Sequence, residues 1–143
     1  MVNNAENRVT LIMESRSANV AFARVAATAF LAPLDPTVGE LSDIKTAVSE
    51  AVTNAVIHGY GDGTGEVRMI LVLEGRNLII EVIDDGVGIE NVSAAREPLF
   101  TTKPELERSG LGFTVMESFM DQVEVYSVPG QGTTVIMSKV LKA

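Results

Sequence analysis

Apolar and mixed positions alternate along residues 8–14 (RVTLIME), a pattern that predicts a β-strand with one buried face. Four later stretches rich in Val, Ile and Leu predict further strands, at residues 67–74, 77–84, 122–128 and 133–140. A short Gly-containing turn from Glu74 to Asn77 joins the first two of these four, and PGQG joins the last two. The sequence therefore predicts two hairpins and one N-terminal strand.

Two stretches between the predicted strands predict helices. ANVAFARVAATAFLA (residues 18–32) follows Ser17, which we expect to cap the helix, and it ends before Pro33. LGFTVMESFM (residues 111–120) follows a glycine-rich stretch and predicts another helix. Residues 86–110 hold several glycines and prolines, and we expect irregular structure there with one helical turn near SAAR.

A third helix is predicted between these two. Thr37 and Glu40 have the spacing of a capping box, and the helix is expected to end near His58. Its core-facing positions recur at helical spacing, namely Leu41, Ile44, Val48, Ala51, Val52 and Ala55. Three helices and two hairpins predict an α+β fold for residues 1–143 as a single domain. This fold is a two-layer α/β sandwich, in which the helices cover one face of a mixed, mostly antiparallel sheet.

Composition narrows the class of protein. The chain has 143 residues, 46% of them hydrophobic, which is typical of a globular domain. It has no cysteine, which excludes disulfides and thiolate chemistry. A net charge of −8 with only 11 Lys plus Arg argues against nucleic-acid binding. The sequence contains no apolar run of the roughly 20 residues that span a membrane, and its N-terminus lacks the pattern of a signal peptide. We expect a cytoplasmic protein without a membrane segment.

Two polar residues interrupt the apolar end of the central helix, SEAVTNAVIHGY. Glu50 and Asn54 are four residues apart, so they lie on the same helix face. An amide oxygen suits Mg²⁺ beside phosphates, and a carboxylate one turn earlier suits a general base. The alternative is that both belong to the solvated edge of an amphipathic helix. His58 continues the spacing, but it is better explained as a favourable charge at the helix C-terminus, and we place it outside the site.

Two glycine-rich stretches also carry candidate chemistry. In DDGVGI (residues 84–89), Asp84 ends a strand and can accept a hydrogen bond from an exocyclic amine, while Gly86 and Gly88 allow close approach of the backbone. The alternative is that these residues form a plain Asp-Gly turn without a ligand. In SGLGF (residues 109–113), a glycine-rich loop leads into a helix, whose first N–H groups can bind phosphate. An ordinary glycine-containing helix start is the alternative.

The order of these motifs is more specific than any one of them. An E-x-x-x-N helix, D-x-G-x-G after a strand, G-x-G before a helix and GTT at residues 132–134 together resemble the ATP-binding fold of the GHKL superfamily, which includes gyrase, histidine kinases and MutL. SEAVTNAVIHGY, PLFTTKPELERSG and ERSGLGF are similar to a narrower family, the sporulation anti-sigma factors of the sigma-F type, which are protein serine kinases. This resemblance covers nearly the whole chain.

The resemblance implies a set of site residues for ATP and Mg²⁺. Asp84 would accept the adenine amino group, helped by the Thr133 hydroxyl and a water, and Gly86 and Gly88 would let the backbone approach the nucleotide. Asn54 would bind Mg²⁺, and Glu50 would be the catalytic base that orients or deprotonates a substrate serine. Backbone N–H groups of a lid would bind the phosphates, namely those of Ser109, Gly110, Leu111 and Gly112. Weaker candidates in the same lid are Thr101, Thr102, Lys103 and Arg108.

The resemblance also implies partners. These are an RNA polymerase sigma factor, which the protein would sequester, and an anti-anti-sigma factor, which it would phosphorylate on serine. Arg24, Glu107 and Arg108 are candidate partner contacts. We expect a homodimer, formed through edge strands because the N-terminal strand would otherwise be exposed.

The sequence shows neither a transducer domain nor a helix pair with a phospho-accepting histidine, so the acceptor is expected on another protein. Two alternatives stay open. One is a nucleotide-gated module that sequesters a sigma factor with little catalysis. The other is a general-stress anti-sigma kinase acting on a different sigma factor.

Overall fold

The computed structural model describes residues 6–60, 64–89 and 112–142. The helical elements are α1 (Ala18–Leu31), the 3-10 helix η1 (Ala32–Leu34), α2 (Val38–Asn54), the π-helical segment η2 (Ala55–Tyr60) and α4 (Gly112–Phe119). The strands are β1 (Asn7–Glu14), β2 (Glu66–Glu74), β3 (Asn77–Asp84), β4 (Gln122–Val128) and β5 (Gly132–Val140). Every predicted helix and strand is present, with bounds that differ by a few residues. The helical turn expected near SAAR lies outside the described residues.

The five strands form one sheet in the order β1-β2-β3-β5-β4. All pairings among the described strands are antiparallel, so the sheet expected to be mixed and mostly antiparallel is antiparallel throughout this part of the chain. Gly75 and Gly130, with φ of 64° and 81°, lie in the two hairpin turns, where positive φ favours glycine. β5 lies beside β3 and runs antiparallel to it, so the start of β5 meets the end of β3.

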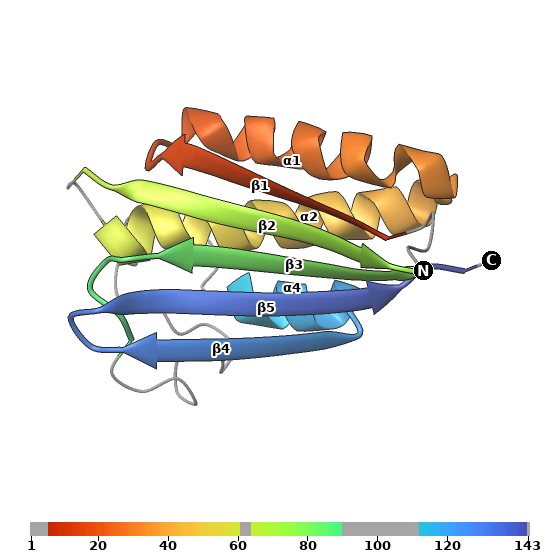
Figure 1. The fold of residues 1–143 in the computed structure, drawn as a ribbon. Coiled ribbons are helices and arrows are strands. Elements are labelled where there is room, and N and C mark those ends of the chain that lie inside the picture. The colour runs from red at the N-terminus through yellow and green to blue at the C-terminus, as the bar shows by residue number, and fades with distance from the viewer. Residues whose placement is uncertain (1–5, 61–63, 90–111, 143) are drawn as a thin grey trace.

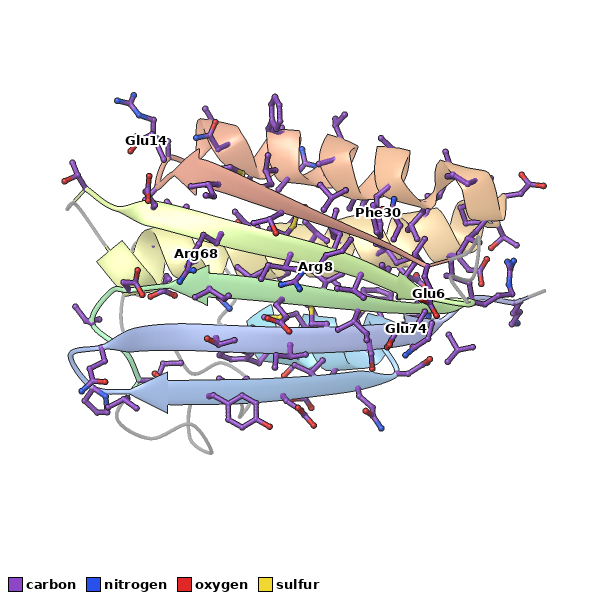
Figure 2. All side chains as sticks on the ribbon, viewed as in Figure 1. Glu6, Arg8, Glu14, Phe30, Arg68 and Glu74 are labelled. Atoms are coloured by element: carbon purple, nitrogen blue, oxygen red, sulfur yellow. The ribbon has the colours of Figure 1, made fainter. Side chains whose placement is uncertain are left out.

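Helices α1, α2 and α4 cover one face of the sheet, and among the described residues no helix lies on the other face (Figure 1). Alternate strand positions face the helices, and in β3 the inward residues Leu78, Ile80 and Val82 are at most 2% exposed. The open face carries charged side chains, among them Arg8 and Arg68 (Figure 2). The predicted two-layer α/β sandwich is confirmed. Within the described ranges, none of the helices is long and apolar enough to span a bilayer.

The start of α2 is fixed by the predicted capping box. Thr37 Oγ1 accepts the Glu40 N–H at 3.0 Å, and Glu40 Oε1 accepts the Thr37 N–H at 2.9 Å. Glu40 Oε2 also accepts the Lys142 N–H at 2.8 Å. The N–H groups of Lys142 and Thr37 hold the pKa of Glu40 below its ordinary value. The helix start is therefore tied to the chain segment that follows β5.

The expected cap of α1 was wrong. Ser17 has helical backbone angles, φ −57° and ψ −34°, and its side chain makes no capping hydrogen bond. A capping serine needs an extended backbone so that its side chain can reach the N–H groups of the first turn. The backbone of Ser17 is helical, so its side chain cannot cap the helix in this way. Its carbonyl oxygen instead accepts the Val20 N–H at 3.1 Å, while the Asn19 side chain donates to the Glu14 carbonyl oxygen at 2.9 Å. The start of α1 is thus held by contacts to the end of β1.

Candidate functional site

Asp84 is the last residue of β3, and its carboxyl group is buried. The residue is 6% exposed, and its Oδ1 accepts the Gly86 N–H at 2.9 Å. Burial raises the pKa of Asp84 to about 6, although the N–H groups of Gly86 and Thr133 act in the opposite direction. Such a shift requires that the fold hold a carboxyl group away from water. A buried acceptor of this kind is suited to a polar ligand more than to stability.

Two glycines allow the loop after β3 to lie against the β4–β5 hairpin. Gly88 has φ of 77° and Gly132 has φ of 108°, where other residues are strained. A Cβ on Gly88 would overlap the Val128 carbonyl oxygen, and one on Gly132 would overlap the Asp84 carbonyl oxygen. The Gly130 N–H also donates to the Val87 carbonyl oxygen at 2.6 Å. The glycine at 88 is thus required by the hairpin contact, and its closeness to a nucleotide stays a prediction.

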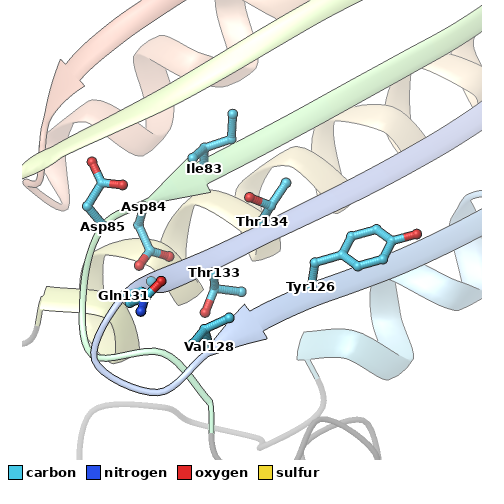
Figure 3. A pocket seen from close by; sticks show the side chains of 9 residues that line it. Ile83, Asp84, Asp85, Tyr126, Val128, Gln131, Thr133 and Thr134 are labelled. Carbon is cyan, nitrogen blue, oxygen red and sulfur yellow. The ribbon is translucent and has the colours of Figure 1, made fainter.

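Thr133 lies directly opposite Asp84 in the β3–β5 register, and both side chains lie at the adjoining ends of these strands (Figure 3). Its Oγ1 is 2.8 Å from Ser127 Oγ on β4. Ser127 Oγ also accepts the Ile89 N–H at 2.7 Å. No sequence motif indicated Ser127, but the register across the PGQG turn would have placed it opposite Thr133.

Glu50 and Asn54 meet the start of α4. A Cβ on Gly112 would lie 3.0 Å from Asn54 Nδ2, 3.2 Å from Asn54 Oδ1 and 3.4 Å from Glu50 Oε2. Gly112 is buried, whereas Glu50 and Asn54 are partly exposed. The predicted pair therefore does face one way, toward the glycine that opens α4, instead of standing on a fully solvated helix edge.

Asn54 is also the last α-helical residue of its helix. The α-helix was expected to run to near His58, but it ends at Asn54, and η2 continues with π-helical geometry to Tyr60. Single π-helical turns of this kind are frequent at functional sites. η2 packs against β3 and β5, and the C-terminal end of α2 lies at the same end of the molecule as the end of β3 (Figure 1). The fold thus brings Glu50 and Asn54 to the end of the sheet that carries Asp84 and Thr133.

A shallow hollow of about 230 Å³ adjoins this end of the sheet. Asp84 and Thr133 line it together with Ile83, Tyr126 and Thr134 (Figure 3). The last three occupy strand positions that alternate with the inward-facing ones, so the hollow opens toward the helix-free face. Because Glu50 and Asn54 do not line it, we do not identify it with the candidate site.

Several predicted site residues lie outside the described residues, and their roles stay predictions: Thr101, Thr102, Lys103, Glu107, Arg108, Ser109, Gly110 and Leu111. Arg24 is described, and its Nη1 donates to Ser49 Oγ at 3.1 Å, which links α1 to α2. The described residues contain no cluster of three or more His, Asp or Glu side chains that could hold a metal ion alone.

These features define a class of protein. Residues 13–139 match the histidine kinase-like ATPase domain family, a nucleotide-binding domain. The chain is 55% identical to the anti-sigma F factor of Clostridium acetobutylicum, over 94% of each chain. It is 57% identical to the anti-sigma F factor of Clostridium perfringens, over 94% of this chain and 96% of that one. The anti-sigma F factor of Geobacillus thermodenitrificans is also 57% identical, over 93% of this chain and 92% of that one. The chain therefore belongs to the histidine kinase-like ATPase domain family and, within it, to the anti-sigma F factors.

Solved structures support the fold. The RsbU and RsbW domains of a Mycobacterium tuberculosis protein match with a TM-score of 0.68 at 21% identity, covering 94% of this chain and 32% of that one. The catalytic domain of histidine kinase ThkA matches with a TM-score of 0.55 at 13% identity, covering 91% of this chain and 95% of that one. At these identities the matches show a shared fold alone, and this fold agrees with the predicted two-layer α/β sandwich.

Proposed function

We propose that residues 1–143 act as a single kinase domain that sequesters a sigma-F-type sigma factor of RNA polymerase and phosphorylates a serine of its anti-anti-sigma antagonist. The observation that carries the proposal is that the side chains of Glu50 and Asn54 both lie close to Gly112, at the start of α4. It supports a general base and a metal ligand at the helix end where phosphates would bind. The name shared by the relatives, anti-sigma F factor, supports the regulatory half.

The base of ATP would be bound at the ends of β3 and β5. Asp84 is buried beside Thr133, so a carboxylate acceptor and a hydroxyl lie together. Adenine offers an amino donor next to a ring-nitrogen acceptor, which this pair of groups can match. The raised pKa of Asp84 supports the same assignment, because a ligand that donates to the carboxylate compensates for its lost hydration.

Mg²⁺ would be held by the Asn54 amide oxygen and by the phosphates. Magnesium commonly takes one or two protein ligands, with phosphates and waters as the others. The start of α4 also supports phosphate binding at this place, because the free N–H groups of a helix N-terminus favour phosphate.

Glu50 would act on the substrate serine. ATP supplies the γ-phosphoryl group, which moves to the serine oxygen while the bond to the ADP leaving group breaks. Glu50 orients the serine hydroxyl and accepts its proton, and Asn54, one turn further along α2, keeps the phosphates in position. Because Glu50 and Asn54 are four residues apart, they lie on one side of the helix, and both side chains lie close to Gly112, where they would face the same substrate.

Sigma factor and antagonist would both act in the cytoplasm, where RNA polymerase works. Arg24, Glu107 and Arg108 are the proposed contacts with these partners. We also propose a homodimer through the edge strand β1, where Val9 and Ile12 are 43% and 58% exposed. Sedimentation of the wild type should give a dimer, and Ile12→Lys should shift it toward monomer. A wild type that is monomeric at micromolar concentration would contradict the proposed homodimer.

Incubation with labelled ATP, Mg²⁺ and a cognate anti-anti-sigma protein tests the kinase half. We expect label on a serine of that protein, and Glu50→Gln should bind ATP normally while transfer falls by about 100-fold or more. Bound ATP without transfer by the wild type would leave a nucleotide-gated sequestering module. Capture of a general-stress sigma factor in place of a sigma-F-type factor would overturn the choice of partner.

A further inference from the structure

Ser127, near the end of β4, lies at the centre of a small hydrogen-bond network. Its Oγ accepts the Ile89 N–H at 2.7 Å, lies 3.0 Å from the Gly132 carbonyl oxygen, to which it can donate, and lies 2.8 Å from Thr133 Oγ1. In the last contact either hydroxyl can be the donor. One side chain thus connects the loop that follows Asp84 with the threonine opposite Asp84.

A serine hydroxyl has one hydrogen to donate and can accept two hydrogen bonds. If Ser127 donates to the Gly132 carbonyl oxygen, the Thr133 hydroxyl must donate to Ser127 to keep their contact. If Ser127 donates to Thr133 Oγ1, the hydrogen of Thr133 can point to a ligand. The direction of the Ser127 hydrogen therefore decides whether Thr133 can act as a donor in the site.

We propose that Ser127 is a positioning residue that sets the hydrogen-bond polarity of Thr133. With nucleotide bound, Ser127 donates to Thr133 Oγ1, and Thr133 donates to ring nitrogen N1 of adenine, directly or through one water. Asp84 accepts from the amino group next to that nitrogen. The inference rests on the proposed function, since it concerns the base of the same nucleotide. To the base contacts already proposed for Asp84 and Thr133, it adds Ser127 as a residue that acts through Thr133.

Binding of base-modified nucleotides tests this role. The probes are ATP and 1-deaza-ATP, which keeps the amino group but lacks the N1 acceptor. For the wild type we expect 1-deaza-ATP to bind about tenfold more weakly than ATP, the effect of one good hydrogen bond. In Ser127→Ala this ratio should fall to about twofold, because Thr133 is no longer held as a donor.

A double-mutant cycle separates positioning from general loosening of the hairpin. Thr133→Val should also reduce the ratio to about twofold, and adding Ser127→Ala should reduce it no further. Ser127→Thr keeps the hydroxyl and should restore the wild-type ratio. Purine riboside triphosphate, which lacks the amino group, should bind more weakly than ATP to every one of these variants, because the Asp84 contact does not depend on Ser127.

Ser138→Ala is the matched control, because Ser138 lies on the same hairpin at a position that faces away from the helices. It should keep the wild-type ratio. The inference is overturned if Ser127→Ala binds ATP and retains the tenfold ratio. It is also overturned if Ser127→Ala weakens all three nucleotides equally or if Ser127→Thr fails to restore the ratio. A wild type that binds no ATP would overturn the proposed function as well, so the two failures can be distinguished.

Discussion

At the scale of single residues, Asp84 links stability to the site. Its pKa is raised from 3.8 to about 6, mainly by burial. As pH rises through this interval, the unfolded chain loses the proton before the folded protein does, so stability falls. The full difference amounts to about 3 kcal/mol at neutral pH, at about 1.4 kcal/mol for each pH unit. The folded protein without ligand therefore carries an unfavourable buried charge at the place where we propose the base binds.

Asp84→Asn should remove this effect, because Asn can still accept the Gly86 N–H but does not ionise. Without nucleotide, the variant should equal the wild type near pH 4 and exceed it by up to about 3 kcal/mol above pH 6. Urea unfolding across this pH range measures the difference. If the gap between variant and wild type narrows as pH rises, burial of the Asp84 charge is not destabilising.

Gly112→Ala tests the close approach of α4 to α2 at Asn54. Its Cβ would lie 3.0 Å from Asn54 Nδ2, so the amide must shift by a few tenths of an ångström. We expect ATP affinity to fall about tenfold or more while the free energy of unfolding changes by less than about 1 kcal/mol. Titration with a fluorescent ATP analogue measures the first, and urea unfolding the second.

Gly39→Ala is the control for this substitution. Gly39 is also in the first turn of a helix, but its Cβ would have 3.9 Å to the nearest atom, Thr37 Oγ1. It should leave ATP affinity unchanged. Equal affinities for Gly112→Ala and the wild type would show that Asn54 can move without consequence for the site.

The placement of residues was predictable where it depends on spacing along one element. Glu50 and Asn54 were predicted to share a helix face because they are four residues apart, and in the structure both side chains lie close to Gly112. Ser127 was not found, since a serine in a strand has no motif of its own. Its pairing with Thr133 follows from the local β4–β5 hairpin, but its contact with the loop after Asp84 depends on β5 lying beside β3, and that is not a local property.

At the scale of elements, the two ends of α2 differ in how well the sequence predicted them. The start was predicted because Thr37 and Glu40 bond to each other's N–H groups within one turn. The end was not, because SEAVTNAVIHGY has good α-helical spacing throughout. The change to π-helical geometry after Asn54 occurs where η2 packs against β3 and β5. Tertiary contacts of this kind override local propensity.

Thr37→Ala should weaken the start of α2 without affecting the site. Loss of the hydroxyl acceptor leaves the Glu40 N–H without its partner, and we expect about 1 kcal/mol lower stability. Thr46→Ala is the control, because Thr46 lies inside the same helix and bonds back to the Ser42 carbonyl oxygen. It should be neutral or slightly stabilising. Chemical unfolding measures both, and an equal loss in the two variants would contradict a specific capping effect.

At the scale of the whole molecule, the two-layer sandwich followed from three helical and five strand patterns, but the sheet order did not. Hairpin turns pair β2 with β3 and β4 with β5 through local sequence. The pairing of β3 with β5 joins two separate hairpins, and only this pairing brings Asp84 opposite Thr133. The half of the candidate site where we propose that the base binds is therefore a product of topology, while the Glu50–Asn54 half is largely a product of one helix.

Binding of ATP should stabilise the whole domain if both halves form one site. At a ligand concentration 100 times Kd, the gain is about 2.7 kcal/mol, which corresponds to a rise in Tm of about 5–10 °C for a chain of this size. Thermal unfolding with and without Mg²⁺-ATP measures this rise. Glu50→Gln should show the wild-type rise, because the base acts on the serine and not on ATP. Asp84→Asn should start from a higher Tm at pH 7 and gain little. A full rise in Asp84→Asn would remove Asp84 from nucleotide binding, and no rise in the wild type would contradict the site itself.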